Sequence, residues 1–227
     1  MNLSFIESEI FMGKFFQQQP EIDHLNLILA PSFPFLPKLK EMIQNHPIQI
    51  AAQDTFWMKS GAYTGEVSPL MLKEMGCSYV LVGHSERRQY FGETDIIVEK
   101  KAIAVHQARM IPIVCIGEHR ESYEEGKTRN VILQQLERVK SINPLWVAYE
   151  PVWSIGSGKI PSKEEVAKVT DLILSECPHA NVLYGGSVSI DNQRMFCSID
   201  SLHGLLVGGL SVKLPDFCVF LEKFKNI

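Results

Sequence analysis

Residues 145–150 read LWVAYE, a continuous apolar run that ends in a carboxylate. Because the apolar residues are consecutive rather than alternating with polar ones, the run is typical of a strand buried on both faces of a parallel sheet. Helical segments separate it from six similar runs, and this alternation predicts right-handed βαβ units. The other runs lie at residues 25–31, 48–53, 79–83, 111–116, 181–184 and 202–207, and the clearest helical segments lie at 69–75, 98–109, 127–140 and 163–175.

A further helix is predicted before the first run, at about residues 4–19. Ser4 followed three positions later by Glu7 is a capping-box pattern, which marks where this helix begins. A closed parallel barrel has eight strands, whereas seven are found here, and the only vacant place lies before residue 1. We therefore expect one α/β domain over residues 1–227, a parallel (β/α) barrel with seven of its eight strands.

The charge and composition disfavour several classes of protein. The net charge is −4 without a long basic run, which argues against a sequence-independent grip on nucleic acid or an anionic membrane. No apolar stretch approaches the ~20 residues of a membrane span, and the N-terminus lacks the basic start of a signal peptide. Five scattered cysteines without a CxxC pair indicate neither a disulfide scaffold nor a zinc site. We therefore expect no metal and a cytoplasmic location.

Two side chains suited to proton transfer follow predicted strands. His84 lies in GHSERR at residues 83–88, and Glu150 ends the run quoted above. Because parallel barrels place catalytic groups at the carboxyl ends of their strands, both are expected at one rim. Histidine suits proton transfer near neutral pH, and a glutamate beside apolar walls has the raised basicity of a general base. The alternatives are a structural histidine in a solvated charge cluster and a loop glutamate that meets an arginine.

The segment after Glu150 has the pattern of a lid. Residues 151–159 read PVWSIGSGK, in which a small apolar centre lies between two ends that resemble hinges. Such a segment excludes water when it closes over a site. A plain surface loop is the alternative, and the apolar Trp-Ser-Ile centre disfavours it.

Two glycine pairs follow the last two predicted strands. They are Gly185-Gly186, ahead of Ser187, and Gly208-Gly209. Glycine lets backbone N–H groups approach an anion closely, and the loops after strands seven and eight of a parallel barrel commonly bind phosphate. A single pair is more typical of a turn, but two pairs on adjacent strands favour a phosphate site.

Together these motifs resemble the triosephosphate isomerase family along essentially the whole chain. The signature tract AYEPVW at residues 148–153 is followed by Ile155 and Gly156. The other matching segments, in family order, are GAYTGE at 61–66, GHSERR at 83–88, CIGE at 115–118, LYGGS at 183–187 and VGG at 207–209. The resemblance implies a TIM barrel and the interconversion of dihydroxyacetone phosphate and D-glyceraldehyde 3-phosphate, a reaction of glycolysis and gluconeogenesis.

The resemblance also implies a role for each site residue. Glu150 would be the base that moves a proton between carbons of the substrate, and His84 the neutral electrophile that polarises the carbonyl. Ser85 and Glu86 would support that site, and Cys115 would pack behind Glu150. The residues implied to bind the substrate phosphate through backbone N–H groups are Gly156, Ser187, Gly208 and Gly209.

The partners follow from the same resemblance. Thr64 lies on the loop that in this family inserts into a neighbouring subunit, which implies a homodimer. The implied substrate is a small phosphorylated three-carbon sugar. No metal or organic cofactor is required, and no nucleic acid or membrane is implied.

The sequence departs from the family pattern at its start. The family's first strand ends in Asn-Trp-Lys-Met-Asn, whose first Asn and Lys contact substrate, and Met1-Asn2 resemble the last two residues of that segment. Loss of one preorganised donor typically lowers a rate by about 10²–10³-fold, so we expect a chain that begins here to be a poor or inactive enzyme. Two explanations stay open: a true start upstream of Met1, which we favour, or a decayed barrel.

Two other functions also stay open at this stage. One is isomerisation of a different sugar phosphate, which would need another base, and none fits better than Glu150. The other is a non-catalytic barrel that only binds a ligand or a partner protein, which the absent Lys favours. Two local expectations remain: Asp54 stands where the family usually has Asn, and residues 118–127 are expected to form a solvated helix start.

Overall fold

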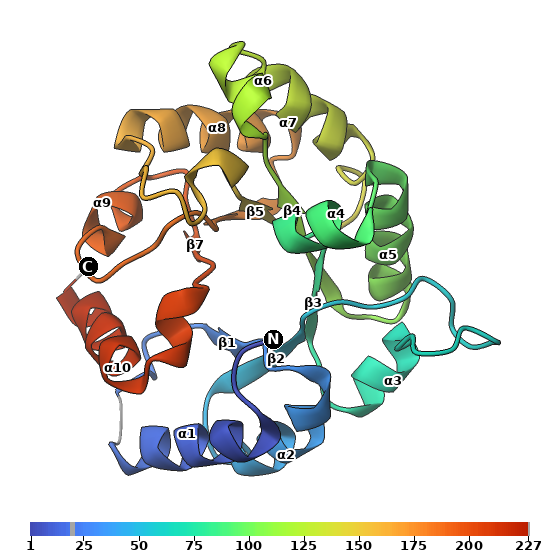
Figure 1. The fold of residues 1–227 in the computed structure, drawn as a ribbon, viewed down its shortest axis with the longest axis vertical. Coiled ribbons are helices and arrows are strands. Elements are labelled where there is room, and N and C mark those ends of the chain that lie inside the picture. Colours follow the sequence, from blue (N-terminus) through green and yellow to red (C-terminus); the bar gives the residue numbers. More distant parts are fainter. Residues whose placement is uncertain (19–20, 227) are drawn as a thin grey trace.

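The computed structural model describes residues 1–18 and 21–226. Its sheet has seven parallel strands, each paired with the next along the chain in the order β1 to β7. Figure 1 shows the strands curled around a central axis with the helices outside them. The predicted α/β fold, with seven strands of a TIM-type barrel, is confirmed. The strands are β1 (Leu27–Leu29), β2 (Ile48–Ala52), β3 (Tyr79–Val82), β4 (Ile111–Ile116), β5 (Leu145–Tyr149), β6 (Ala180–Tyr184) and β7 (Gly204–Leu205).

The two outermost strands are shorter than their apolar runs. β7 has two residues where the pattern predicts 202–207, and β1 has three where it predicts 25–31. Among the described residues, β1 pairs only with β2, and β7 pairs only with β6. Because a strand with one partner lacks half of its ladder hydrogen bonds, the regular pairing ends sooner at the two edges.

The helices cover the outer side of the sheet. The predicted first helix is α1 (Phe5–Gln17); Gln19 lies outside the described residues. Its capping box is confirmed, since the Ser4 hydroxyl accepts from the N–H of Glu7 and the Glu7 carboxylate accepts from the N–H of Ser4 at 2.7 Å. In the described part of the chain, no helix combines the length and apolarity needed to cross a bilayer. The other helices are α2 (Leu36–Met42), α3 (Pro69–Glu74), α4 (Ser85–Phe91), α5 (Asp95–Gln107), α6 (Arg120–Glu124), α7 (Thr128–Glu137), α8 (Lys163–Glu176), α9 (Gln193–Cys197) and α10 (Leu214–Glu222), with short 3₁₀ turns η1 (Phe33–Phe35), η2 (Val152–Ser154), η3 (Gly209–Val212) and η4 (Lys223–Asn226).

Apolar side chains fill both faces of the sheet. Val80, Val114 and Val147 belong to the large cluster between the strands and the helices. Because successive strand residues point to opposite faces, the neighbours of these valines point into the curl of the sheet. Burial on both faces explains why the strands read as consecutive apolar residues. The inner cluster consists of Ala51, Tyr79, Leu81, Ile113, Cys115, Ala148 and Leu183.

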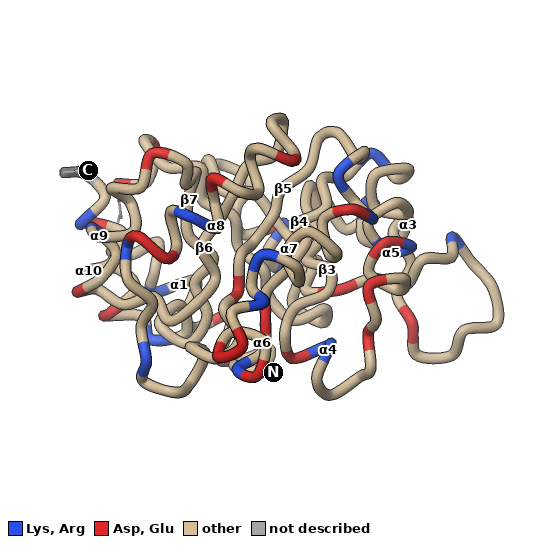
Figure 2. The backbone as a smooth tube through the Cα atoms, turned by 90° about the horizontal axis from the view of Figure 1, so that it is seen from above, with Lys and Arg blue, Asp and Glu red and all other residues tan. Residues whose placement is uncertain are grey.

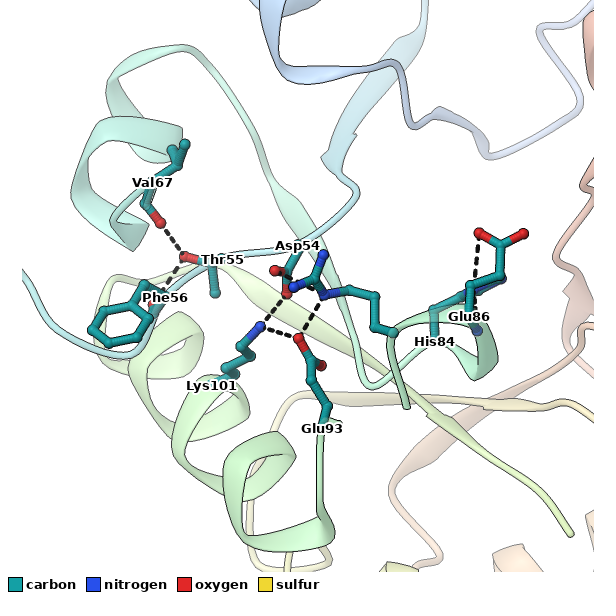
Figure 3. Close-up of polar contacts among 9 residues, drawn as sticks. Asp54, Thr55, Phe56, Val67, His84, Glu86, Glu93 and Lys101 are labelled. Carbon is teal, nitrogen blue, oxygen red and sulfur yellow. Dashed lines mark hydrogen bonds and ion pairs between the residues drawn. The ribbon is translucent and has the colours of Figure 1, made fainter. Parts of the chain in front are cut away.

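Three buried charged side chains and one half-buried arginine, here called the charge quartet, join the segment after β2 to α4 and α5 (Figure 3). They are Asp54, Arg87, Glu93 and Lys101. The Lys101 ammonium is 3% exposed and lies 2.6 Å from Asp54 and 2.5 Å from Glu93. The Arg87 guanidinium lies 2.9 Å from Asp54 and 2.5 Å from Glu93. Burial raises the pKa of Asp54, and the two cations oppose that rise. Two carboxylates and two cations therefore balance one another at a largely buried site.

We expect Lys101→Met to lower the free energy of unfolding by about 3–5 kcal/mol, because it removes the more deeply buried of the two cations that Asp54 and Glu93 share. Urea denaturation followed by circular dichroism measures the change. Lys100→Met is the matched control: the side chain is exposed and, among the described residues, contacts the ring of Trp57, so we expect a loss below about 1 kcal/mol. Equal losses in the two variants would show that the quartet does not stabilise the fold.

Candidate active site

His84 and Glu150 meet at the carboxyl ends of the strands. His84 comes two residues after β3 and Glu150 directly after β5, and His84 Nε2 lies 3.1 Å from Glu150 Oε1. The chain turns at Gly83, whose φ is +70°, and a Cβ there would lie 2.6 Å from Val98 Cγ2. Only glycine fits this turn, which brings the His84 ring to the rim.

The carboxylate of Glu150 is held almost entirely out of water, with 2% of the residue exposed. Its Oε2 accepts a hydrogen bond from the backbone N–H of Ser85 at 2.9 Å. Among the described residues, no donor meets Oε1 with hydrogen-bond geometry, although the His84 ring lies beside it. Burial raises the pKa of Glu150 by more than His84 and Ser85 lower it. Oε1 is therefore a basic oxygen with a free lone pair.

Cys115 lies at the end of β4, against the same carboxylate. Burial, and then the charge of Glu150, raise the pKa of the Cys115 thiol well above its usual range. The thiol therefore keeps its proton, and its presence beside Glu150 lowers the pKa of that carboxyl group by less than burial raises it. The chain just after β4 lies so close to the chain just after β5 that a Cβ at Gly117 would lie 1.8 Å from the carbonyl oxygen of Glu150.

The ring of His84 is oriented by the start of α4. His84 is the N-cap residue of this helix, and its Nδ1 accepts a hydrogen bond from the N–H of Glu86 at 3.4 Å. A ring nitrogen that accepts a hydrogen bond carries no proton, so the proton is on Nε2, on the side of Glu150. The Glu86 carboxylate is exposed, and its Oε2 lies 3.9 Å from Nδ1 of His84 (Figure 3). Ser85 therefore contacts the glutamate, and Glu86 contacts only the histidine.

The segment predicted as a lid has buried ends and an exposed tip. Residues 155–160 are exposed, whereas Trp153, within the 3₁₀ turn η2 (Val152–Ser154), is only 8% exposed. The indole Nε1 of Trp153 donates to Glu118 Oε1 at 2.8 Å, and the Tyr149 hydroxyl lies 3.2 Å from the same oxygen. Burial raises the pKa of Glu118. This glutamate therefore anchors the first end of the lid.

The expected solvated helix start at residues 118–127 is wrong for Glu118, which is 0% exposed. The helix that follows, α6 (Arg120–Glu124), has no buried residue. Glu118 comes two residues after β4, at the same rim as His84 and Glu150. The rule that identified those two residues at strand ends would therefore also have identified Glu118.

The structure brings some of the predicted phosphate-binding residues together. The Ser187 hydroxyl donates to the carbonyl oxygen of Ser154 at 2.8 Å, which joins the loop after β6 to the lid. Gly156 lies on the exposed tip of the lid with φ of +67°. Gly208 and Gly209 follow β7 and are exposed; among the described residues, their N–H groups donate to no other residue. These N–H groups remain available to an anion, although nothing links them directly to the lid.

Thr64 lies away from this cluster. It is exposed on the loop between β2 and α3, which projects beyond the helices in Figures 1 and 2. The hydroxyl of Thr55 donates to the carbonyl oxygen of Val67 at 3.1 Å and closes the base of this loop. Thr64 is therefore presented outward and takes no part in the site at the rim.

The rim supplies one basic oxygen on Glu150, one N–H donor on His84 and unpaired backbone N–H groups nearby. Within the described chain, no group of three or more His, Cys, Asp or Glu side chains is placed to hold a metal ion. A buried base beside a hydrogen-bond donor is suited to removing a proton next to a carbonyl group and stabilising the oxygen that becomes negative.

The comparison with known families decides the assignment. A model of the family described as triosephosphate isomerase matches residues 1–224. The chain belongs to the triosephosphate isomerase family. It is 39% identical to the triosephosphate isomerase of Dictyoglomus turgidum over 226 residues, which cover 93% of this chain and 91% of that protein. It is 42% identical to that of Citrifermentans bemidjiense over 211 residues, or 86% of this chain and 84% of that protein. It is 41% identical to that of Dehalococcoides mccartyi over 208 residues, which cover 86% of this chain and 82% of that protein.

For this triosephosphate isomerase family member, we expect Glu150 to titrate above the ordinary glutamate pKa of about 4.3, because burial disfavours its charge. Activity that depends on ionised Glu150 is then lost as the pH falls through this raised value. NMR of the ¹³C-labelled carboxyl group measures the midpoint. Glu165, whose pKa is lowered by the Ser162 N–H, is the internal control and should titrate below the ordinary value. A midpoint for Glu150 at or below that of Glu165 would contradict the expectation.

Proposed function

We propose that this chain interconverts dihydroxyacetone phosphate and D-glyceraldehyde 3-phosphate. The observation that carries the proposal is the buried Glu150 carboxylate, with its unpaired Oε1 beside Nε2 of His84, in a chain of the triosephosphate isomerase family. Curated relatives with this name are 39–42% identical to the chain. The reaction moves one proton between two adjacent carbons and a hydroxyl proton between their oxygens, and this site presents one base for the first of these transfers.

In the proposed mechanism, Oε1 of Glu150 removes a proton from the carbon next to the substrate carbonyl. Negative charge then develops on the carbonyl oxygen, and the Nε2–H of His84 donates a hydrogen bond to it. The same carboxyl group returns the proton to the neighbouring carbon. Because burial raises the pKa of Glu150, the carboxylate is a stronger base than a solvated one.

The phosphate and the lid have supporting roles in this proposal. The backbone N–H groups of Gly156, Ser187, Gly208 and Gly209 bind the substrate phosphate, so closure of the lid brings Gly156 to the same anion. The Ser187 contact with Ser154 keeps the phosphate loop and the lid in register. A closed lid excludes water and holds the intermediate where it cannot shed its phosphate.

We expect Glu150→Gln to lower kcat/KM for isomerisation by at least about 10²–10⁴-fold, because an amide cannot accept the substrate proton. Coupled assays in both directions measure the rate, and circular dichroism checks the fold. Glu164→Gln, an exposed substitution at the start of α8, should leave the rate unchanged. If the unsubstituted chain binds a triose phosphate analogue but does not turn over substrate, the non-catalytic reading is favoured instead. Retention of the rate in Glu150→Gln would exclude Glu150 as the base.

We also propose that the chain forms one domain, acts as a homodimer and resides in the cytoplasm. The loop that carries Thr64 supports the dimer, since the ring of Phe56 stacks on Trp57 with centroids 3.9 Å apart, packs at a tilt against Tyr63 at 4.6 Å and stiffens a projecting segment. All five cysteines are free, as is typical of a reducing compartment. Figure 2 shows acidic and basic residues interspersed along the chain, which supports a small-molecule substrate over a polyanion.

We expect Thr64→Arg to raise the dissociation constant of the dimer at least tenfold, because an unpaired guanidinium would be buried in the partner. Sedimentation velocity over a concentration series measures this constant. Asn130→Arg, on the exposed face of α7, adds the same side chain outside the proposed interface and should not change it. A dimer of unchanged affinity in Thr64→Arg would show that this loop does not form the interface.

A further inference from the structure

Tyr123, on α6, contacts the first end of the lid. Its ring stacks on the indole of Trp153, with centroids 4.1 Å apart and an angle of 22° between the planes. Trp153 begins the lid, and its N–H is already held by Glu118. The stack therefore covers the one aromatic side chain through which the lid is anchored to the barrel.

The hydroxyl of Tyr123 reaches the other end of the lid. It donates to Glu165 Oε1 at 2.8 Å, and Oε2 of the same carboxylate accepts from the N–H of Ser162 at 2.8 Å. Ser162 is the N-cap residue of α8, three residues after Lys159. One side chain therefore touches Trp153 at the start of the lid and, through Glu165, the residue that fixes its end.

The hydrogen bond from the Tyr123 hydroxyl to Glu165 has an ionised acceptor. The N–H of Ser162, and secondarily the Tyr123 hydroxyl, lower the pKa of Glu165, while its carboxylate raises the pKa of Tyr123. The acceptor is thus ionised and the donor protonated over the neutral range. Hydrogen bonds with an ionised partner are stronger than neutral ones, so this contact persists at working pH.

Close packing does not hold the indole in place on this side. A cavity of about 370 Å³ lies beside the stack, and Trp153, Tyr123, Lys168 and Leu172 are among the residues that line it. A side chain next to open space has room to rotate unless a specific contact restrains it. Tyr123 supplies such a contact to the face of the indole, in addition to the hydrogen bond that Glu118 accepts from its N–H.

We propose that Tyr123 is a positioning residue for the lid, holding both of its ends so that the exposed tip moves as a unit between fixed hinges. The inference rests on the proposed isomerase function, because the lid matters only if there is an intermediate to enclose. Without these contacts of Tyr123, the two ends of the lid move independently, so its tip closes less completely over the substrate phosphate. The intermediate then eliminates inorganic phosphate: its C–O bond to phosphate breaks, the electron pair leaves with the phosphate, and the enol that remains gains a proton on carbon and loses one from oxygen to give methylglyoxal.

The test measures kcat/KM for isomerisation in the full chain, and two further quantities. The first is the fraction of turnovers that release inorganic phosphate instead of isomerised product. The second is the fluorescence anisotropy decay of Trp153, observed alone in a Trp57→Phe, Trp146→Phe background, which requires no turnover. Tyr123→Ala removes both the stack on Trp153 and the hydrogen bond to Glu165, whereas Tyr123→Phe removes only the hydrogen bond. Ser122→Ala, on the same helix, is the control.

We expect Tyr123→Ala to lower kcat/KM by about 3- to 10-fold, the worth of one aromatic stack, and to raise phosphate release by a similar factor. The motion of Trp153 should increase in the same variant. Tyr123→Phe should fall between the unsubstituted chain and Tyr123→Ala in all three, and Ser122→Ala should change none. A uniform loss of rate without a change in phosphate release or in anisotropy would overturn the inference while leaving the isomerase function in place. Absence of turnover in the unsubstituted chain would instead refute the function, whatever the anisotropy shows.

Discussion

A single carboxylate is kept out of water at the end of β5, and the surrounding elements are arranged to keep it there. Glu150 receives a hydrogen bond from the first residue of α4, and the buried thiol of Cys115 lies at the end of β4. Backbone closes on it from both neighbouring strands: a Cβ at Gly117 would meet its carbonyl oxygen at 1.8 Å, and one at Gly185 would meet its Cγ at 3.0 Å. The basicity of the proposed catalytic base follows from this burial, because desolvation dominates its pKa.

The charge quartet connects the fold to this site. Arg87 lies on α4, whose first residue, Ser85, donates to Glu150, so the quartet restrains the helix that orients both catalytic candidates. Asp54 lies at the start of the segment leading to the projecting loop that carries Thr64. Asp54 stands where the family usually has Asn, and its negative charge allows the quartet to balance two cations rather than one. The proposed subunit loop and the site at the rim are therefore fastened at one buried point (Figure 3).

The lid combines a free tip with restrained ends. Its first end is held by Glu118 and by the stack on Tyr123, and the residue after its second end is held by Glu165. Loops that must close over a substrate belong to the least stable parts of a fold, and motion confined to a short tip limits the entropy lost on closure. The buried polar contacts at the ends thus serve the accuracy of closure more than the stability of the barrel.

Local patterns in the sequence were sufficient to predict the strands, the capping box at Ser4 and the barrel class. Continuous apolar runs report burial on both faces, and a cap depends on residues three positions apart. The strand-end rule also predicted that His84 and Glu150 share one rim. Pairings between distant residues were decided by tertiary structure alone: Lys101 reaches Asp54 across 47 positions, and Trp153 reaches Glu118 across 35. No local periodicity encodes such pairs, because a charged residue reads as solvent-exposed until the fold supplies its buried partner.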